Sequence, residues 1–518
     1  MTERDVFGRE HVAVWSAAEA AALDREARER HGVPERVLME DAGRSAALIL
    51  DRLYPRGRVV AAVGSGNNGG DALVLLRTLR AWGREVAAVV AGSREPDPGL
   101  THGHDVPILP FESHAAAFAG AEVLVDGILG TGASGAPRGR AAEAIRALNA
   151  SGRPIVALDL PSGVDATTGQ VPGEVVSAAV TVTFGWPKLG LFFPPARWAC
   201  GRILAVEIGF PPLDPEREPP AMLITPAWAA ARLPARRPDA HKGSVGRVLI
   251  AGGGYGMAGA AATAVRAAMR AGAGYVRLAA PELNREVLQA RVPEAVYADL
   301  DDAGAVQAAA AAVDAALIGP GFGRDDAARH RLALVLEATR GLPTLLDADA
   351  LTLLAEEPDR LCDVAAERPL LVTPHPGEMG RLVRREAGEI VAAPLDAARA
   401  AAERFGCVVL LKGAPSVVAA PGAPVLIATL HSSDLATAGM GDQLGGVAAA
   451  FMAAGAAPRD AAGLALHYCG RAADLAARGR SLLPDDVSEA MDRAFADPGA
   501  EAPPLGFPFI TFDQPPRW

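Results

Sequence analysis

Short apolar runs alternate with helix-like runs along almost the whole chain, and this alternation limits the possible folds more than any other feature. The runs in the first part are RVVAAV, EVAAVVA, EVLVDGI, PIVALDL and AVTVTF. Those in the second part are GRVLIAG, GYVRLAA, AALIGPG, PTLLDAD, PLLVTPH and CVVLLKG. Strands that alternate with helices form mostly parallel sheets that helices cover on both faces. The sequence therefore predicts an α/β fold.

A proline-dense stretch, GFPPLDPEREPP, divides the two sets of runs and shows no apolar periodicity. Such a composition is typical of a linker. The 518 residues also exceed the usual size of one domain. We therefore expect a first domain over residues 1–213, a linker over 214–222 and a second domain over 223–497. The proline-rich tail, 498–518, is expected to be irregular.

Charge and cysteine content exclude several classes of protein. The formal net charge is −11 and no basic stripe is present, so we expect no nucleic-acid partner. The four cysteines are far apart and form no C-x-x-C pair, which argues against a zinc site or a disulfide framework. The charged N-terminus lacks the apolar core of a signal peptide, and arginines bound the Gly/Ala-rich stretch 248–265. We expect a cytoplasmic protein without a membrane partner.

Polar side chains follow many of the predicted strands. In the first part these residues are Asn67, Asn68, Asp71, Asp126, Asp159 and Ser162. In the second part they are Asp347, Asp349, His375 and Lys412. Functional groups of α/β folds gather where parallel strands end, so we expect each set to converge on one edge of its sheet.

A glycine motif, G-x-G-x-x-G at Gly64, Gly66 and Gly69, follows the first strand and opens a helix. Alone it is a weak signal, because tight strand-to-helix turns need glycine for packing as well. A dehydrogenase usually ends its next strand with a carboxylate that holds the ribose. Here that strand ends in Ala91, Gly92 and Ser93, so we reject an ordinary NAD dehydrogenase.

An ordered set of motifs is more specific: GSGNNGGDA, LVDGILGTGASG, ALDLPSGVDATTG and VTFGWPKLGLF. Together they closely resemble the NAD(P)H-hydrate epimerase family, over almost all of the first 210 residues. The resemblance implies a Rossmann-like α/β/α domain. In that family the dinucleotide is a damaged substrate, which would explain a dinucleotide-type loop without a ribose carboxylate.

The resemblance also implies a site. The substrate would contact Asn67, Asn68, Gly69, Gly70, Asp71, Gly130, Thr131, Gly132, Ala133, Ser134, Gly135, Ala136 and Asp159. A potassium ion would be held by Asn68, Asp126 and Ser162, whose oxygens are hard ligands. Asp159 would move the proton needed to invert the hydroxylated ring carbon. Alternatives stay open: Asp126 and Asp159 can cap turns, Gly69 and Gly70 can serve helix packing, and Lys188 is either a phosphate ligand or an exposed surface lysine.

A second chemical motif, GMGD, ends at Asp442 and opens a predicted helix. N–H groups at a helix start stabilise a transferring phosphoryl group. An aspartate beside them can take the proton of an attacking hydroxyl. These residues favour phosphoryl transfer, with Asp442 as the base.

The motifs GGGYGMAG, ALIGPGFGR, LLDADALTLL, LVTPHPGEMGRL, VVLLKGAPSVV and ATAGMGDQLGG occur in that order. Over residues 225–495 they resemble the ADP- or ATP-dependent NAD(P)H-hydrate dehydratases, which have a ribokinase-like α/β fold. The resemblance implies hydrate contacts at Ala260, Gly321, His375 and Asp442. It implies nucleotide contacts at Lys412, Gly413, Ala414, Pro415, Ser416 and Gly441, with Mg²⁺ accompanying ADP or ATP. His375 can alternatively be a turn residue, and we expect Asp347 and Asp349 to fix the loop.

The chain departs from its relatives before the GMGD motif. Relatives usually carry Gly-Asn-Pro and then Ala-Thr-Gly-Gly-Ser/Thr-Gly-Asp, whereas this chain has HSSDLATAGMGD. Ala438 replaces a glycine and would be strained if it needed a positive φ. Met440 replaces a hydroxyl residue and removes a side-chain donor near the phosphate. The backbone donors remain, so we expect activity with an altered nucleotide affinity.

The function that we predict is bifunctional metabolite repair. The first domain would equilibrate the R and S hydrates of NADH and NADPH (NADHX and NADPHX), and the second would dehydrate the S form with ADP or ATP. We also expect a homo-oligomer. One alternative is a vitamin or sugar kinase with an accessory domain, which would release a stable phosphoester. The other is a non-catalytic nucleotide-binding scaffold.

Overall fold

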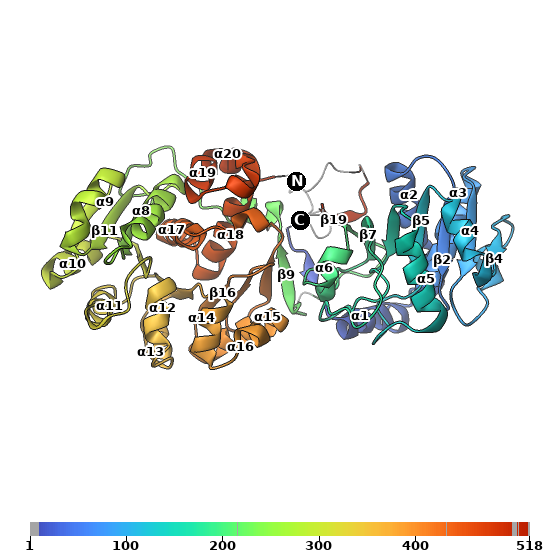
Figure 1. The fold of residues 1–518 in the computed structure, drawn as a ribbon, viewed down its shortest axis with the longest axis horizontal. Helices are drawn as coiled ribbons and strands as arrows, with labels where there is room; N and C mark the ends of the chain where they lie inside the picture. Colours follow the sequence, from blue (N-terminus) through green and yellow to red (C-terminus); the bar gives the residue numbers. More distant parts are fainter. Residues whose placement is uncertain (1–9, 215, 431, 500–504, 506, 516–518) are drawn as a thin grey trace. The chain divides into compact units, whose positions relative to one another are not determined.

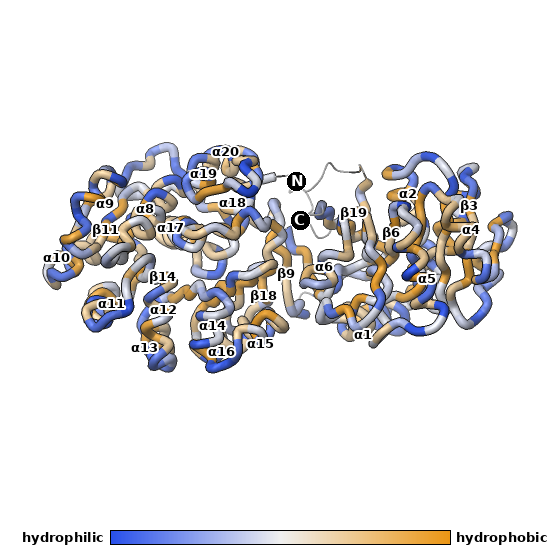
Figure 2. Tube along the Cα trace, viewed as in Figure 1, coloured by the Kyte–Doolittle hydropathy of each residue, from blue (hydrophilic) through white to orange (hydrophobic). Residues whose placement is uncertain are grey.

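The computed structural model describes residues 10–214, 216–430, 432–499, 505 and 507–515. The chain divides between Met222 and Leu223 into two compact units, and the residues from Ala500 onward return to the first unit. Figure 1 shows that each unit is a sheet with helices packed on it, and Figure 2 shows hydrophobic residues concentrated along the strands. This confirms the predicted α/β class.

The first unit is built on an eight-stranded sheet in the order β19-β8-β7-β6-β5-β2-β3-β4. All neighbouring strands are parallel except β19 and β8. The strands are β2 (Val59–Val63), β3 (Val86–Val90), β4 (Ile108–Leu109), β5 (Val123–Gly127), β6 (Ile155–Leu158), β7 (Val180–Phe184), β8 (Arg202–Val206) and β19 (Ile510–Gln514). The helices are α1 (Ala17–Glu29), α2 (Glu35–Leu53), α3 (Asn67–Ala81), α4 (His114–Ala119), α5 (Gly139–Ala150) and α6 (Ala196–Ala199), with 3-10 turns η1 (Pro98–Leu100), η2 (Phe111–Ser113) and η3 (Leu189–Leu191).

Two apolar layers cover this sheet, as expected for a parallel sheet that is buried on both faces. Successive side chains of a strand point to opposite faces. Val59, Ala61 and Val63 of β2 therefore pack with α2 and α3, whereas Val60 and Ala62 pack with α4 and α5. The sheet thus holds the loops at its carboxyl edge on a rigid base.

The tail departs from the prediction. Residues 510–514 form β19, which pairs antiparallel with the edge strand β8. Asp513 accepts hydrogen bonds from Arg202 Nε at 2.7 Å and Nη2 at 2.5 Å, and Phe512 is buried against Phe192. The expectation of an irregular tail over 498–518 is therefore wrong for this segment, because the edge of the first sheet supplies the hydrogen-bonding partner that a short strand requires.

The sheet of the second unit runs β9-β18-β17-β16-β15-β14-β13-β10-β11-β12. Neighbouring strands from β16 to β12 are parallel, whereas β17 pairs antiparallel with both β16 and β18. Its strands are β9 (Ala221–Ile224), β10 (Arg247–Ala251), β11 (Tyr275–Ala280), β12 (Val296–Asp299), β13 (Ala315–Ile318), β14 (Thr344–Leu346), β15 (Leu370–Val372), β16 (Val408–Leu411), β17 (Val417–Ala419) and β18 (Val425–Ala428). Each run predicted as a strand in either unit contains one.

The helices of the second unit include α8 (Ala258–Arg270) and α17 (Met440–Ala453), which pack closely. A Cβ on Gly446 of α17 would lie 2.2 Å from the carbonyl oxygen of Ala264, so only glycine allows this approach. The other helices are α7 (Pro226–Arg232), α9 (Arg285–Arg291), α10 (Ala303–Ala310), α11 (Asp326–Ala338), α12 (Ala348–Leu354), α13 (Arg360–Glu367), α14 (Pro376–Val383), α15 (Ala387–Ala392), α16 (Pro394–Phe405), α18 (Pro458–Ala476), α19 (Pro484–Glu489) and α20 (Met491–Ala496), with 3-10 turns η4 (Glu282–Asn284), η5 (Ser433–Leu435) and η6 (Gly479–Ser481). This packing fixes the start of α17 beside the sheet.

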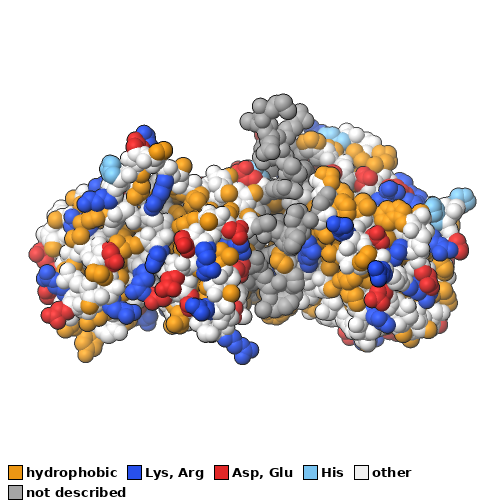
Figure 3. Space-filling model, turned by 90° about the horizontal axis from the view of Figure 1, so that it is seen from above, with side chains coloured by type: hydrophobic (Ala, Val, Ile, Leu, Met, Phe, Trp, Pro, Cys, Tyr) orange, Lys and Arg blue, Asp and Glu red, His pale blue; other side chains and the backbone are white. Residues whose placement is uncertain are grey.

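The predicted linker over 214–222 is shorter than expected. Ala221 and Met222 already belong to β9, and they pair antiparallel with Val14 and Ala13 of β1 (Ala13–Val14). The apolar run AMLI therefore starts a strand inside the predicted linker. No helix within the described ranges is long and apolar enough to cross a membrane. Figure 3 shows basic and acidic side chains interspersed on the face that it presents.

Candidate functional site

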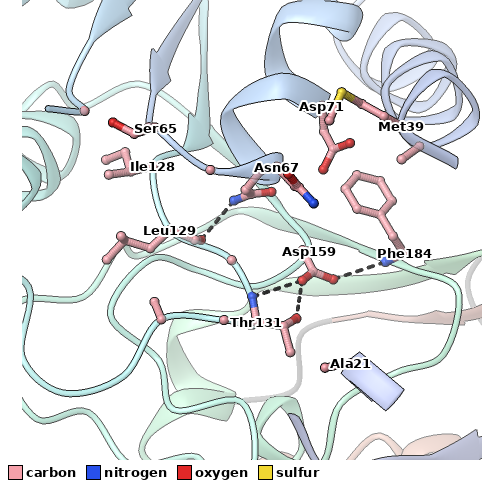
Figure 4. A pocket seen from close by; sticks show the side chains of 18 of the residues that line it. Ala21, Met39, Ser65, Asn67, Asp71, Ile128, Leu129, Thr131, Asp159 and Phe184 are labelled. Atoms are coloured by element: carbon pink, nitrogen blue, oxygen red, sulfur yellow. Dashed lines mark hydrogen bonds between the residues drawn. The ribbon is translucent and has the colours of Figure 1, made fainter. Parts of the chain in front are cut away.

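A pocket of about 1140 Å³ opens at the carboxyl edge of the first sheet. Its wall is formed by loops that follow parallel strands: residues 64–68 after β2, 91–94 after β3, 128–133 after β5, and Asp159 after β6 (Figure 4). These strands end at one edge of the sheet, which explains why residues distant in sequence meet here. The volume is ample for a ligand larger than a typical drug molecule.

Most of the residues assigned to the epimerase substrate lie on this wall, namely Asn67, Asn68, Asp71, Gly130, Thr131, Gly132, Ala133 and Asp159. Gly69 and Gly70 are not part of it. A Cβ on Gly69 would lie 2.2 Å from the carbonyl oxygen of Gly64, and one on Gly70 would lie 2.7 Å from Met39 Cε. Close packing against backbone therefore accounts for Gly69, whereas at Gly70 the neighbour is the end of a flexible side chain. Residues 134–136 are also outside this wall.

Asp159 is the most strongly held carboxylate of the pocket. It lies directly after β6 with a φ of 64°, which turns its side chain toward the loop after β5. Its Oδ2 accepts hydrogen bonds from the hydroxyl and the backbone N–H of Thr131, and its Oδ1 accepts one from Lys188 Nζ at 2.5 Å. Burial alone would raise the pKa of Asp159, but Lys188 and these donors outweigh burial and lower it. Asp159 is therefore an ionised carboxylate at neutral pH.

Lys188 corrects the sequence interpretation, which regarded it as an exposed lysine or a phosphate ligand. Its side chain is buried, and its ammonium also donates to the carbonyl oxygen of Phe184 at 2.9 Å and to Thr183 Oγ1 at 3.3 Å. A buried carboxylate needs a compensating charge, and Lys188 supplies it for Asp159. The sequence offers a signal for this pair. Lysine is rare in the chain, and Lys188 follows a strand of the same sheet as Asp159, so it is a candidate for the compensating charge.

Asp71, at the start of α3, faces the same pocket from the other side (Figure 4). Burial raises the pKa of Asp71 well above its ordinary value, the negative charge of Asp159 adds to this effect, and Lys188 offsets part of it. The pocket thus contains one carboxyl group whose pKa is raised and one whose pKa is lowered. Environments that separate two pKa values in this way are typical of acid–base sites.

A second cluster lies behind the pocket wall and contains the residues assigned to potassium. Asp126 is fully buried, and it accepts hydrogen bonds from Ser162 Oγ at 2.6 Å and from Ser162 N at 2.8 Å. Burial raises its pKa to about 6 despite these donors. Asn68 Nδ2 donates to the carbonyl oxygen of Leu129 at 2.9 Å, whereas the buried Asn68 Oδ1 has no hydrogen-bond partner within the described chain. Ser162 Oγ lies 3.3 Å from the same Leu129 carbonyl oxygen, so Leu129 links Asn68 to the Asp126–Ser162 pair. A buried polar oxygen without a hydrogen-bond partner in a native fold needs a ligand such as water or an ion.

In the second unit, residues from four predicted motifs lie together at the start of α17. Lys412 Nζ lies 2.8 Å from Asp347 Oδ1 and 4.0 Å from Glu378 Oε2. A Cβ on Gly441 would lie 3.5 Å from Lys412 Nζ and 3.8 Å from Asp347 Oδ2, so the helix start touches this charged group. The carboxyl ends of β14 and β16 and the start of α17 therefore meet at one place, as the sequence predicts.

The pKa of Asp442 is set by this neighbourhood. Burial raises it to about 7, the Asp347 carboxylate adds to the rise, and Lys412 acts in the opposite direction. Burial would lower the pKa of Lys412, but the nearby carboxylates of Asp347 and Glu378 outweigh it and raise that pKa. The pKa of Asp442 is thus close to the value that suits a general base at neutral pH.

The neighbouring loop residues have mainly structural contacts. Asp349 accepts hydrogen bonds from Gly323 N at 3.0 Å and Arg324 Nε at 2.6 Å, so it fixes the loop as expected. His375 caps α14, because its Nδ1 accepts from Gly377 N at 3.0 Å and from Glu378 N at 3.4 Å. His375 therefore has a structural role in this turn, and its half-exposed ring places Nε2 3.4 Å from Glu378 Oε1.

The remaining dehydratase residues lie on loops at the same edge. Gly321 has a φ of 55°, and a Cβ on it would lie 3.1 Å from Ala260 Cβ, so the two predicted hydrate contacts are neighbours. Gly413 and Ser416 close a turn by mutual hydrogen bonds of 3.1 Å, and this turn exposes residues 413–414.

The unusual segment before GMGD is not strained at its alanine. Among described non-glycine residues, positive φ values occur at Asp159, Ala348, Arg384 and Ala477, and Ala438 is not one of them. The left-handed position is taken by Gly439, with a φ of 88°, immediately before α17. Ser432 caps the 3-10 turn η5 by accepting from Asp434 N at 3.1 Å. His431 lies outside the described residues.

Comparisons with known proteins agree with both halves of this description. A family model described as "YjeF-related protein N-terminus" matches residues 35–190, and one described as "NAD(P)H-hydrate dehydratase" matches residues 248–493. The dehydratase of Bacillus subtilis, crystallised with ATP and Mg²⁺, is 29% identical over 53% of this chain and 97% of its own, with a TM-score of 0.47.

Relatives that span both units carry one name, bifunctional NAD(P)H-hydrate repair enzyme Nnr. The protein of Moorella thermoacetica is 37% identical over 90% of this chain and 92% of its own length. That of Salinibacter ruber is 37% identical over 93% and 96%, and that of Escherichia coli is 35% identical over 93% of each. These matches decide against the small-molecule kinase alternative. The chain belongs to the family of bifunctional NAD(P)H-hydrate repair enzymes.

Proposed function

We propose that the first unit interconverts the R and S hydrates of NADH and NADPH, and that the second converts the S hydrate back to NAD(P)H with ADP or ATP. The observation that carries the first assignment is the buried Asp159–Lys188 pair on the wall of a dinucleotide-sized pocket. The fusion of the two units would allow repair of both epimers. The second unit would accept only the S hydrate, and the first unit would convert the R hydrate into it.

The epimerase residues have separate roles in this proposal. In a hydrated nicotinamide ring, the hydroxyl is bonded to a carbon next to the ring nitrogen. Asp159, kept ionised by Lys188, would accept the hydroxyl proton while the bond between that carbon and the ring nitrogen breaks and leaves an aldehyde. Asp71, whose pKa burial raises, would donate a proton to the released nitrogen. Attack of the nitrogen on the other face of the aldehyde, with return of both protons, would then give the other epimer. Backbone N–H groups of residues 130–133 would bind the diphosphate, as N–H-lined loops do.

A potassium ion fits the cluster behind the wall. The unpaired Asn68 Oδ1, the Asp126 carboxylate and the Ser162 hydroxyl supply hard oxygen ligands, which suit such a cation. A cation there would lower the pKa of Asp126 and fix the loop after β5 on which Thr131 lies. In this proposal the ion positions the loop and takes no part in proton transfer.

In the second unit, Asp442 would accept the proton of the ring hydroxyl. The oxygen of that hydroxyl would attack the terminal phosphorus of the nucleotide. The nucleotide leaves with one phosphate fewer, and the ring carries a phosphate ester. Loss of inorganic phosphate, together with a proton from the adjacent ring carbon, then restores the double bond. N–H groups at the start of α17, including that of Gly441, are placed to stabilise the transferred phosphoryl group.

A magnesium ion bound with the nucleotide would neutralise phosphate charge. Such an ion needs only one or two protein carboxylates beside the phosphates, and Asp347 and Asp442 lie together here. The turn of Lys412–Ser416 would contact the nucleotide, whereas Ala260, Gly321 and His375 would contact the hydrate. A homo-oligomer remains a prediction.

The direct test is to incubate the protein with mixed hydrates and either ADP or ATP, and to follow NAD(P)H absorbance and free phosphate together. Equal amounts of NAD(P)H and phosphate are expected. A lasting phosphate ester, or no turnover with either nucleotide, would contradict the proposal.

A further inference from the structure

The end of β3 is the feature of the first pocket that the proposed function leaves unexplained. β3 pairs in parallel with β2, and the residues that follow it, 91–94, line the pocket. In dinucleotide-binding sheets this position contacts the ribose of the adenosine half: a carboxylate binds a free 2′-hydroxyl, whereas an arginine accommodates a 2′-phosphate. Here the wall carries Ser93 and Arg94, and Glu95, the next residue, lies outside it. The side chains present therefore suit a phosphorylated ribose.

The backbone holds Arg94 in place at this position. A Cβ on Gly92 would lie 2.2 Å from Ser65 Oγ and 2.7 Å from Ser65 N, so the two loops are in close contact. Arg94 N donates a hydrogen bond to Ser65 Oγ at 3.0 Å. The turn after β3 is thus attached to the loop that starts α3, and Arg94 extends from a fixed backbone.

The charge distribution of the pocket points the same way. Arg94 and Arg138 both line it, and neither guanidinium forms an ion pair or hydrogen bond with another described residue. By contrast, Arg77 and Arg84 of the same unit pair with carboxylates. A guanidinium without a partner on a pocket wall can bind phosphate through two parallel hydrogen bonds. Four carboxyl side chains line the pocket: Asp71 and Asp159 at the proposed reacting ring, and Asp24 and Glu35 on α1 and α2. None of them belongs to the segment 91–94 after β3.

We propose that Arg94, assisted by the Ser93 hydroxyl, binds the 2′-phosphate of hydrated NADPH and makes the first unit select NADPHX over NADHX. This inference rests on the epimerase pocket proposed above. Arg138, which follows the loop assigned to the diphosphate, would serve both hydrates equally. Arg94 is thus a specificity-determining residue, and it takes no part in proton transfer.

The test measures epimerisation of each hydrate without added ADP or ATP, so that no dehydration competes. Wild type, Arg94→Ala, Arg94→Lys and Arg138→Ala are compared, with Arg52→Ala as a control of equal charge change outside the pocket. Hydrogen bonds to charged groups contribute about 1.5–3 kcal/mol, so we expect Arg94→Ala to lower kcat/KM for NADPHX about 10- to 100-fold. We expect less than a twofold change for NADHX. Arg94→Lys should retain part of the preference, because it keeps the charge but loses the paired geometry.

The alternative outcomes are distinct. An equal loss for both hydrates in Arg94→Ala would place Arg94 at the diphosphate and overturn the inference, as would no change for either. A wild type that prefers NADHX, with the preference lost in Glu95→Gln, would assign the ribose to Glu95 instead. A wild type that epimerises neither hydrate would overturn the proposed epimerase function itself. Arg94 is exposed, so its variants should unfold like wild type, and a thermal scan checks this.

Discussion

Replacement of Lys188 by methionine would test the first site through both stability and activity. Lys188 Nζ lies 2.5 Å from Asp159 Oδ1, and the two side chains are only 6% and 14% exposed. At an effective dielectric constant of about 20, opposite charges at that separation attract by about 7 kcal/mol. Desolvation cancels much of this attraction. Removal of Lys188 nevertheless leaves the Asp159 carboxylate buried without an opposite charge. We therefore expect the unfolding free energy of the first unit to fall by about 3–5 kcal/mol.

The same substitution should change the titration of Asp159. Without the ammonium, burial dominates, and the pKa of Asp159 rises instead of falling. A lowered carboxyl pKa stabilises the fold above the ordinary carboxyl pKa, and this stabilisation is lost as pH falls through the folded-state value. In Lys188→Met the folded-state pKa is raised, so the loss of stability should be larger at pH 8 than at pH 5. Epimerisation requires the ionised base, so its acid limb should move to higher pH.

The assay combines epimerisation rates between pH 5 and 9 with denaturant unfolding at the two ends of that range. Lys242→Met, at an exposed lysine of the second unit, is the matched control and should behave like wild type. The double variant Lys188→Met/Asp159→Asn should be more stable than Lys188→Met alone, because the unpaired charge is gone. An unchanged acid limb together with a loss below 1 kcal/mol would refute the reasoning.

Three further predictions concern other parts of the molecule. Asp442→Asn should lower nucleotide-dependent NAD(P)H recovery at least about 100-fold with epimerisation unaffected, and wild-type recovery should fall as pH drops below about 7, the pKa of the base; near-normal recovery in the variant would contradict the assignment. Phe512→Ala should destabilise the first unit by about 3–5 kcal/mol, and a fragment that ends at Pro219 should be less stable than one to which residues 505–518 are fused, as unfolding curves would show. Potassium should stabilise the first unit more at pH 8 than at pH 5, because the pKa of Asp126 near 6 leaves a neutral carboxyl at the lower pH; equal stabilisation at both, or none, would count against the ion.

The sequence predicts the strand runs and the convergence of their polar ends well, because both follow from local patterns. Val59–Val63 is apolar at every position, which is typical of a strand buried on both faces. Asp126 is the second-to-last residue of β5, and Asp159 directly follows β6. The glycine motif at Gly64 and Gly69 is ambiguous for a physical reason: a Cβ on either residue would collide with backbone, so packing alone requires glycine there.

The features that sequence analysis missed depend on tertiary contacts. The strand Ile510–Gln514 exists because β8 offers an unpaired edge and Arg202 a partner for Asp513, and neither is visible in a local window. In the sequence Lys188 resembles a surface lysine. In the structure, the turn after β7 brings its ammonium into contact with the Asp159 carboxylate. Ala438 occupies a position where relatives have glycine, yet the left-handed residue is Gly439, so the condition under which Ala438 would be strained is not met.

The division of labour between the two units is tested most directly by one time course with Asp159→Ala. The variant receives a mixture of both epimers with excess nucleotide, and NAD(P)H absorbance is followed. The account predicts a fast phase at the wild-type rate that consumes the S epimer, because Asp159 belongs to the other unit and distant sites act independently. Recovery should then stall, or continue only at the spontaneous rate of epimer exchange, and catalytic amounts of Asp442→Asn protein should restart it. Complete recovery in a single phase would contradict the account, because it would show that Asp159 is dispensable or that the second unit accepts both epimers.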